Sequence, residues 1–409
     1  MSQALAHYAG LVHRCFGGEH HVASPLGAWL LLALCAPLAS GSDRDALVDA
    51  LGLDPEVAAH RAAALMDNVH DVVGSGVAVW NRPQVETDRL AAWRKSLPRA
   101  TTTGDIPPQH ELDDWAAERT LGLIRSFPLE VNEDDVILLA SALATKVSWE
   151  VPYDLVPGAE LGASSGWATL LERVLASPFH HPRHDQFVTE TKEIGTAVVH
   201  NVRARGGLWV MSVAAAPEVP AHDVLRVAYE LACVEAVEPR SLRRVSLFDL
   251  PVGDGPMWRI QEEEVETAAR DGREELCRAI LPAWSADSKV DLTSDGLGFP
   301  SAARALSEVL GHRNLPFRAA QSAMAAYSRV GFEAAAVTGL AISMSRPHMV
   351  QGLCRTADLR FGHPFGVVAV AVDENKNPRA SVRTGQRGPW HGIPVFSAWV
   401  AEPSEADGK

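Results

Sequence analysis

A cluster of histidine and carboxylate side chains offers the first candidate chemistry. The stretch FHHPRHD, residues 179–185, holds three histidines and an aspartate. His181 and His184 have the spacing of a shared metal site if they stand on a helix, but Pro182 lies between them and opposes a helix. We therefore interpret the stretch as a solvated loop, with a metal site as the alternative.

No other stretch has the pattern of a known catalytic or cofactor site. H-E-x-x-H, G-x-S-x-G, Walker A and dinucleotide-binding glycine patterns are missing from the sequence. The acidic run EEEVE, residues 262–266, is typical of a solvated strand or turn. We expect no cofactor and no metal, and the sequence leans against an enzyme. The 11 tryptophans still leave room for a small-molecule pocket.

One long stretch concentrates small side chains far along the chain. It reads VGFEAAAVTGLAISMSRP, residues 330–347. A helix would tolerate the alanines, whereas a buried strand would favour larger side chains. A segment that passes between loop and strand would need small residues that suit both states.

Composition describes an ordinary globular chain with a strong negative charge. The sequence has 409 residues, is 47% hydrophobic and carries a net charge of -14. A polyanion would be repelled, so we expect no nucleic-acid partner.

Cysteine usage and the amino-terminal sequence predict where the protein resides. The five cysteines are odd in number and form no C-x-x-C pair, which favours reduced thiols. The first residues lack signal-peptide architecture, and the longest apolar stretch, residues 26–38, is too short for a bilayer and contains Pro37. We expect a soluble, cytoplasmic protein that does not bind membranes.

Hydrophobic periodicity predicts helices first and strands later. We expect helices over residues 24–38, 43–53, 111–127 and 300–310, and a central strand buried on both faces within residues 134–150. Further strands are expected over residues 74–83, 195–204, 206–218, 244–253, 257–266 and 395–403, and a hairpin over residues 365–385. The two types do not alternate strictly, so an α+β fold is favoured.

Five stretches together resemble one family, the serpins, in a divergent bacterial-type form. They occupy residues 23–53, 112–127, 136–154, 281–302 and 361–385, in the family's order. Lys146 and Trp149 match the serpin strand motif Asn-Ala-x-x-Phe-Lys-Gly-x-Trp. The resemblance implies large mixed and antiparallel sheets with surrounding helices and an exposed reactive-centre loop. It also implies one domain over residues 1–402, followed by a flexible tail over residues 403–409.

The alanine-rich stretch resembles the serpin hinge. In an inhibitory serpin the target protease cuts the exposed loop, and the hinge half inserts as a new strand into the main sheet with the acyl-enzyme attached. Small side chains suit this movement between strands. The matching residues are Gly331, Phe332, Glu333, Ala334, Ala335, Ala336, Val337 and Thr338.

Departures from the family fall where insertion should begin. Phe332 replaces the usual Thr or Ser, and a phenyl group in that slot would overpack it by roughly 1–3 kcal/mol. Arg329 and Val330 replace two acidic residues. In the polar cluster that begins at Ser24 and controls sheet opening, Gly27 replaces Ser, Ser141 replaces Asn and Gln321 replaces His.

The position of the scissile bond differs with the direction of counting. Counting from the hinge gives Ser345–Arg346, where Pro347 would hinder cleavage after Arg346. Counting back from the His-Pro-Phe motif at residues 363–365 gives a bond near Leu353–Cys354. The candidate residues are Met344, Ser345, Arg346, Leu353 and Arg355.

Three functional classes follow from the resemblance and its departures. The first is a monomeric suicide inhibitor of a serine or cysteine protease. The alternative is a non-inhibitory serpin-fold protein with a binding, chaperone or carrier role, because Phe332 and the altered cluster hinder insertion. Catalysis on a small molecule is the third, and no residue constellation supports it.

Overall fold

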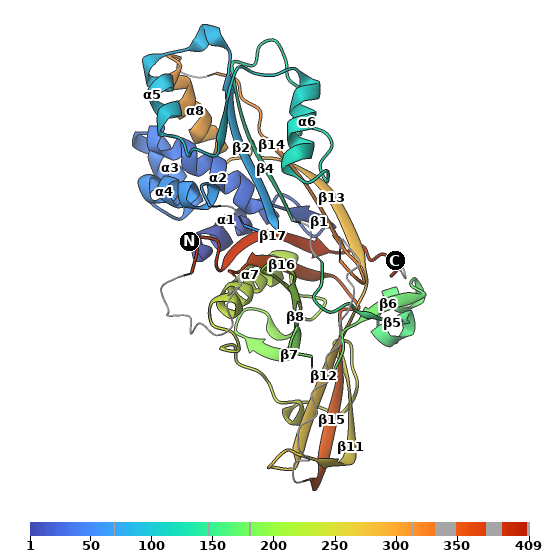
Figure 1. Ribbon diagram of the computed structural model, residues 1–409. Helices are drawn as coiled ribbons and strands as arrows, with labels where there is room; N and C mark the ends of the chain where they lie inside the picture. Colours follow the sequence, from blue (N-terminus) through green and yellow to red (C-terminus); the bar gives the residue numbers. More distant parts are fainter. Residues whose placement is uncertain are drawn as a thin grey trace. The chain divides into compact units, whose positions relative to one another are not determined.

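The computed structural model describes residues 1–68, 70–145, 148–179, 181–312, 315–331, 349–373 and 387–406 (Figure 1). Two units emerge, each assembled from segments far apart in the sequence. Unit 1 consists of Met1–Lys146, Ala286–Ala325 and Val368–Ala398, and unit 2 of Val147–Ser285, Ala326–Val367 and Trp399–Lys409. Whether the chain unfolds as the single domain expected over residues 1–402 stays a prediction.

Unit 1 contains most of the helices. They are α1 (Ser2–His13), α2 (Pro25–Cys35), α3 (Gly41–Leu51), α4 (Pro55–Met66), α5 (Asp88–Ser96), α6 (Gln109–Arg119) and α8 (Phe299–Val309). Its strands are β1 (His21–Ala23), β2 (Val73–Asn81), β3 (Thr101–Gly104) and β4 (Ile137–Thr145), together with most of β13 (Trp284–Asp291), β14 (Ala320–Tyr327), β16 (Phe365–Ala371) and β17 (Ile393–Val400).

Helix α2 forms the centre of this unit because every one of its residues is buried. Pro25 at its first position has the fixed φ that a helix start needs, and Pro37 follows its end. Two tryptophans attach their indole N–H groups to this region: Trp29 donates to the Leu51 carbonyl and Trp93 to the Leu34 carbonyl. These bonds fix α2 relative to its neighbours and give both indole donors a partner.

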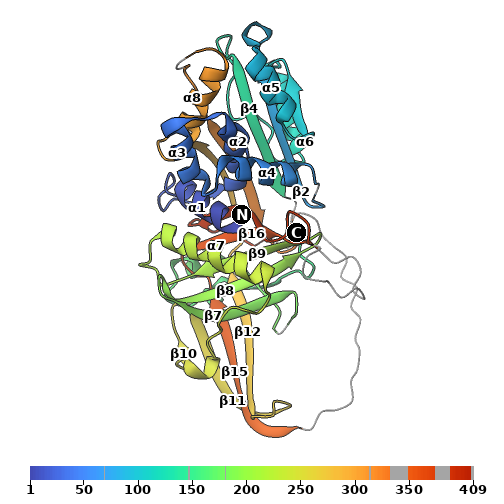
Figure 2. The same cartoon turned by 90° about the vertical axis from the view of Figure 1, so that its left-hand side faces the viewer.

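Strands β3, β2 and β4 form one sheet in that order, and β13 and β14 form another. Helix α6 packs on β2 and β4, with Leu112 and Ala116 contacting Trp80, Leu138 and Ala140, and Figures 1 and 2 show it beside these strands. Because β4 is an edge strand of its sheet, its second edge has no partner strand among the described residues.

Unit 2 is mainly β-structure. Its elements include β5 (Asp154–Pro157), β6 (Arg173–Ala176), β7 (His184–Thr191), β8 (Gly195–Ala204), β9 (Leu208–Ala214), α7 (Ala221–Val237), β10 (Gly253–Asp254), β11 (Trp258–Thr267), β12 (Arg273–Leu281) and β15 (Val350–Arg360). Strands β7, β8 and β9 form an antiparallel meander. A second sheet has the order β10-β11-β15-β12-β6-β5.

Strand β15 separates two strands that are neighbours in sequence. It pairs antiparallel with β11 and parallel with β12, and Figure 2 shows the three strands side by side. Strands β11 and β12, joined by residues 268–272, therefore do not form a hairpin with each other. The segment that follows the alanine-rich stretch is held on both edges.

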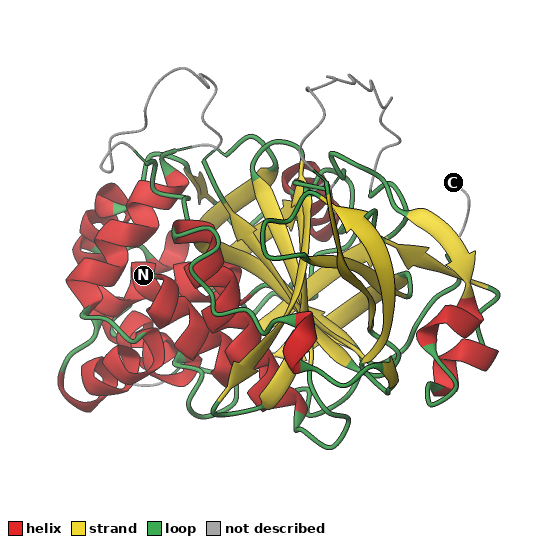
Figure 3. Ribbon diagram, turned by 90° about the horizontal axis from the view of Figure 1, so that it is seen from below, coloured by secondary structure: helices red, strands yellow, loops and turns green. Residues whose placement is uncertain are grey.

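The sequence-based fold class is confirmed: helices and mostly antiparallel sheets make up an α+β protein (Figure 3). The predicted helices over residues 24–38, 43–53 and 300–310 correspond to α2, α3 and α8. Among the predicted strands, residues 74–83, 195–204, 206–218, 257–266 and 395–403 overlap with β2, β8, β9, β11 and β17.

The central strand predicted to be buried on both faces is wrong in that detail. Burial alternates along β4, with Leu138 and Ala140 buried under α6 and Leu139 and Ser141 half-exposed on the other face. The second face is apolar but borders a cavity, which sequence cannot show.

Two further predictions need correction. Residues 244–253 do not form one strand, because Leu247–Asp249 form a 3-10 helix in which the Ser246 side chain accepts a hydrogen bond from the Phe248 N–H. The helix expected to reach residue 127 ends at Arg119, since Leu121 and Gly122 adopt left-handed φ values of 57° and 79°.

At the carboxyl terminus, two residues of the predicted tail form hydrogen bonds, and the flexibility of the tail stays a prediction. Ser404 donates its N–H to the Ala283 carbonyl at 2.7 Å, and the Glu405 carboxylate accepts from the Arg173 N–H at 2.6 Å. The second strand of the hairpin expected over residues 365–385 lies outside the described residues.

Candidate functional site

Four residues predicted to form the polar cluster do come together in unit 1. The Ser24 N–H donates to Gln321 Oε1 at 3.1 Å, and Gln321 Nε2 donates to the Ser24 carbonyl at 2.8 Å. The Ser24 hydroxyl donates to the Val395 carbonyl at 3.2 Å. Ser24 and Gln321 are both buried, so the glutamine side chain satisfies main-chain groups that water cannot reach.

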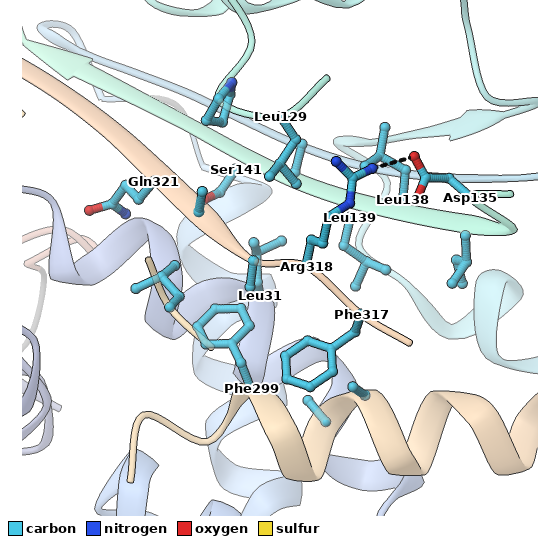
Figure 4. Close-up of a pocket in the computed structure, with 18 of the residues that line it drawn as sticks. Leu31, Leu129, Asp135, Leu138, Leu139, Ser141, Phe299, Phe317, Arg318 and Gln321 are labelled. Atoms are coloured by element: carbon cyan, nitrogen blue, oxygen red, sulfur yellow. Dashed lines mark hydrogen bonds and ion pairs between the residues drawn. The ribbon is translucent and has the colours of Figure 1, made fainter. Parts of the chain in front are cut away.

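Glycine at position 27 gives this cluster its close packing. A Cβ atom there would lie 3.0 Å from Ser141 Oγ and 3.4 Å from Gln321 Nε2. A larger residue would therefore displace the hydroxyl or the amide. Gly27, Ser141 and Gln321 form one compatible set, so the polar cluster is rebuilt with other residue types. Figure 4 shows Ser141 and Gln321 on β4 and β14.

A cavity of about 550 Å³ opens beside this cluster, between β4 and β14. The two strands belong to separate sheets. Helix α2 contributes Leu31, helix α8 contributes Phe299, and Phe317 precedes β14, as Figure 4 shows. The walls are mostly apolar, and every lining residue belongs to unit 1.

An ion pair marks one end of the cavity. Arg318 donates to Asp135 at 2.6 Å, and the side chains are 43% and 24% exposed (Figure 4). The Asp135 carboxylate also accepts from the Asn132 N–H at 2.8 Å. Because both side chains are partly exposed, the ion pair stabilises the structure by only roughly 0–1 kcal/mol. It therefore holds this end of the cavity together weakly.

Unit 2 holds the base of the alanine-rich stretch, residues 328–331. The Trp149 indole N–H donates to the Ser328 carbonyl at 2.8 Å, and the Trp149 main-chain N–H donates to the Val330 carbonyl at 3.2 Å. Gly331 forms a bridge with Ser148. Trp149, which matches the family motif, thus holds the base of the alanine-rich stretch against the segment that follows β4.

Two tyrosines that sequence analysis missed support this loop base. The hydroxyls of Tyr153 and Tyr327 are hydrogen-bonded to each other, and the Tyr153 N–H donates to the Arg329 carbonyl at 3.0 Å. The Tyr327 ring lies 4.6 Å from the Trp149 ring. Only the proximity of Tyr153 to the Trp149 motif and of Tyr327 to the hinge could have indicated them.

Buried histidines lie behind these tyrosines. His184 and His200 stack at 5.5 Å, and the Tyr153 ring meets His184 edge-on at 4.9 Å. Burial lowers the pKa of His184 to about 4 and that of His200 well below its ordinary value, and each ring would repel charge on the other or on His181. Both rings are therefore neutral near pH 7.

The interpretation of residues 179–185 as a solvated loop is wrong for His184. This residue begins β7, where it pairs with Val202, and its Nε2 lies 2.8 Å from the Val151 carbonyl oxygen. Among the described residues, no group of three or more potential ligands could hold a metal ion.

Several predicted site residues lie outside the described residues. They are Lys146, the hinge residues Phe332, Glu333, Ala334, Ala335, Ala336, Val337 and Thr338, and the cleavage candidates Met344, Ser345 and Arg346.

The other two cleavage candidates lie inside the β11–β15–β12 ladder. Leu353 pairs with Glu264 and Arg273, and its N–H donates to the Gly272 carbonyl at 2.8 Å. Arg355 donates to Glu262 and to two main-chain carbonyls, and its guanidinium lies 4.7 Å above the Phe248 ring. A protease needs a free extended backbone, so this conformation withholds both positions.

Similarity to known proteins appears at the level of structure. No family model and no curated protein matches the sequence. Thyroxine-binding globulin in complex with thyroxine matches with a TM-score of 0.62 at 14% identity, over 99% of this chain and 100% of that one. Serpin48 of the insect Tenebrio molitor has a TM-score of 0.59 at 14% identity, over 98% of each chain. The thermophilic serpin tengpin, in its native state, has a TM-score of 0.62 at 12% identity, over 98% of this chain and 94% of that one.

The chain therefore has the serpin fold, which confirms the family resemblance of its sequence at the level of fold. These proteins differ in their described properties, one being bound to thyroxine and one being a highly specific serpin, so the fold alone does not define the function. No helix in the described part of the chain is both long and apolar enough to cross a membrane.

Replacement of Gln321 tests the stabilising role of the polar cluster. Gln321→Leu leaves the buried Ser24 N–H without a partner and leaves the Ser24 carbonyl with only the Gly27 N–H, so we expect the free energy of unfolding to fall by about 1–3 kcal/mol. Gln351→Leu, on the exposed part of β15, is the matched control and should change it by less than about 0.5 kcal/mol. Equal effects in urea unfolding would contradict the assignment.

The buried histidines predict a loss of stability in acid. His13 and His21 in unit 1 also have lowered pKa values because they are buried. Since the folded-state pKa lies below the unfolded value of about 6.5, the unfolded chain takes up protons first. Above about pH 6.5 these histidines do not lower the free energy of unfolding. As the pH falls towards 4 they do lower it, by on the order of 3 kcal/mol for His184.

Urea unfolding between pH 7.5 and 4.5 measures this loss. His184→Asn should flatten the pH dependence, whereas His60→Gln, on the exposed side of α4, should leave it unchanged. A slope that is the same in all three proteins would show that other groups govern acid stability.

Proposed function

We propose that this protein is a serpin-type inhibitor of a serine or cysteine protease that acts by inserting its cleaved loop between β4 and β14. One observation carries the proposal: in the described part of the chain these strands lie in separate sheets, and a cavity lies between them. Among the described residues each strand pairs on one edge only, β4 with β2 and β14 with β13.

An inserted strand would satisfy these two edges. Unpaired N–H and C=O groups along an edge strand are a template for a further strand. Ala334, Ala335 and Ala336, with Val337 and Thr338, are small enough to pass between β4 and β14 and to pair with both. Insertion after cleavage would draw the attached protease away from the cut and distort its active site.

The ladder around β15 narrows the proposed cleavage site. Leu353 and Arg355 are paired on both sides, which favours the bond positions at Met344, Ser345 or Arg346. Cleavage after Arg346 would suit a trypsin-like enzyme, but Pro347 follows. Cleavage after Met344 or Ser345 would select other proteases. We therefore propose that the target has a preference other than basic residues.

A non-inhibitory binding or carrier protein is the second candidate. Its support is the rebuilt polar cluster, in which Gln321 forms hydrogen bonds with the main-chain N–H and carbonyl of Ser24, together with Phe332 at the hinge. Both features oppose sheet opening. In either case we propose a monomer that acts in the cytoplasm without nucleic acid.

The melting temperature after loop cleavage separates the two candidates. A protease that nicks residues 339–348 should raise the melting temperature of an inserting protein, because new ladder hydrogen bonds and buried methyl groups stabilise the nicked form. Mass spectrometry locates the nick. A melting temperature that stays level or falls would reject insertion and favour the binding protein.

Replacement of Phe332 tests the hinge. Phe332→Thr should increase the ratio of covalent protease complex to cleaved free protein, because the overpacking cost of roughly 1–3 kcal/mol is removed. Adding Gln321→His and Ser141→Asn should increase it further, since these changes act on the same step. Thr338→Ser is the control. A denaturing gel gives the ratio, and an unchanged ratio would show that Phe332 does not limit insertion.

A further inference from the structure

The base of the alanine-rich stretch, residues 328–331, is held in place by hydrogen bonds from one neighbouring segment of unit 2. We propose that the buried hydroxyl pair of Tyr153 and Tyr327 is a latch that keeps this loop base in a closed turn and thereby positions Gly331 for the start of strand insertion. The consequence for insertion rests on the proposed function, whereas the closed turn is a property of the intact protein.

The hydrogen bonds of the loop base define a turn rather than a strand. The Arg329 carbonyl accepts from the Tyr153 N–H at 3.0 Å. The next carbonyl, that of Val330, accepts from the Trp149 N–H at 3.2 Å. Successive carbonyls of a β-strand point to opposite edges, so two consecutive carbonyls that bond to the same segment require a turn.

The two tyrosines close this turn from behind. Tyr327 is the last residue of β14, directly before the turn, and Tyr153 belongs to the segment that donates to it. Both side chains are buried, and burial raises the pKa of each hydroxyl above its ordinary value. Each hydroxyl therefore keeps its proton near pH 7, and one donates to the other. The Tyr327 ring is also packed against the rings of Trp149 at 4.6 Å and Trp284 at 5.9 Å.

The segment that carries Tyr153 is fixed on its other side. Trp149 forms an antiparallel bridge with Ala204 at the end of β8, and two main-chain hydrogen bonds of 2.9 and 3.2 Å flank this bridge. These bonds do not involve the loop base. Loss of the hydroxyl pair would therefore free the turn and leave its support in place.

The turn also sets the direction in which the chain continues. Gly331 forms an antiparallel bridge with Ser148, which lies shortly after the end of β4 at Thr145. If an antiparallel pair is extended from this bridge, each later residue lies opposite an earlier residue of the chain before Ser148, and the pair soon reaches β4. The φ of Gly331 is 81°, which glycine adopts without strain. The latch therefore holds the point from which the proposed insertion would run.

Amide hydrogen exchange in the intact, uncleaved protein tests the latch directly. Tyr153→Phe and Tyr327→Phe each remove one hydroxyl, so the main-chain N–H groups at positions 149 and 153 should exchange roughly 2- to 10-fold faster, as expected for the loss of one neutral hydrogen bond. Both variants break the same bond, so the double variant should exchange no faster than the single variants. Additive increases in the double variant would overturn the latch. If one single variant does not fold, the other carries the comparison.

Tyr8→Phe is the matched control. The Tyr8 hydroxyl is also buried, donates to the Leu297 carbonyl at 3.2 Å and belongs to unit 1. Its loss should lower the melting temperature about as much as the loss of a latch hydroxyl, but it should leave exchange at positions 149 and 153 unchanged. Equally fast exchange in Tyr8→Phe would show that the tyrosines contribute only to overall stability, and would reject the latch.

Cleavage within residues 339–348 tests the positioning role of the latch. In Tyr153→Phe and Tyr327→Phe the melting temperature should rise by as many degrees as in the unaltered protein, but roughly 2- to 10-fold more slowly, because Gly331 is no longer held at the starting point. Tyr8→Phe should keep the unaltered rate. An equal or faster rise in the latch variants would reject the positioning role. If the melting temperature of the unaltered protein does not rise at all, insertion is rejected, but the exchange result still decides whether the latch exists.

Discussion

Two hydrogen bonds between one glutamine side chain and one serine main chain hold the candidate site together. Gln321 accepts from the Ser24 N–H and donates to the Ser24 carbonyl, and so joins the start of α2 to β14. The position of α2 sets the floor of the cavity, and the position of β14 sets its width. Both follow from a contact that leaves little room for a side chain at position 27.

Sequence predicted the fold better than it predicted the site. The serpin order of segments and the burial of α2 could be inferred, because continuous apolar patterns and proline positions are local properties. The hydrogen bond between Gln321 and Ser24 joins residues 297 positions apart. The sequence could therefore indicate which residues belong to the polar cluster but not how they bond to one another. Tyr153 and Tyr327 were missed for the same reason, since isolated tyrosines carry no pattern.

The errors in secondary structure have local physical causes that single-sequence periodicity cannot weigh. Residues 244–253 alternate like a strand, yet the Glu275 carboxylate, from another strand, accepts from the Leu247 N–H at 2.9 Å and stabilises a helical turn. The two-sided burial expected for β4 fails because a cavity, rather than a packed partner, faces Leu139 and Ser141. Cavities are properties of several elements together.

The placement of β15 between β11 and β12 has a consequence for synthesis of the chain. A ribosome completes Trp258–Thr267 and Arg273–Leu281 well before it reaches Val350–Arg360. Until then the two earlier strands lack the partner that belongs between them, although a short connection holds them close. Nascent chains therefore expose long strand edges that must avoid both each other and neighbouring polypeptides.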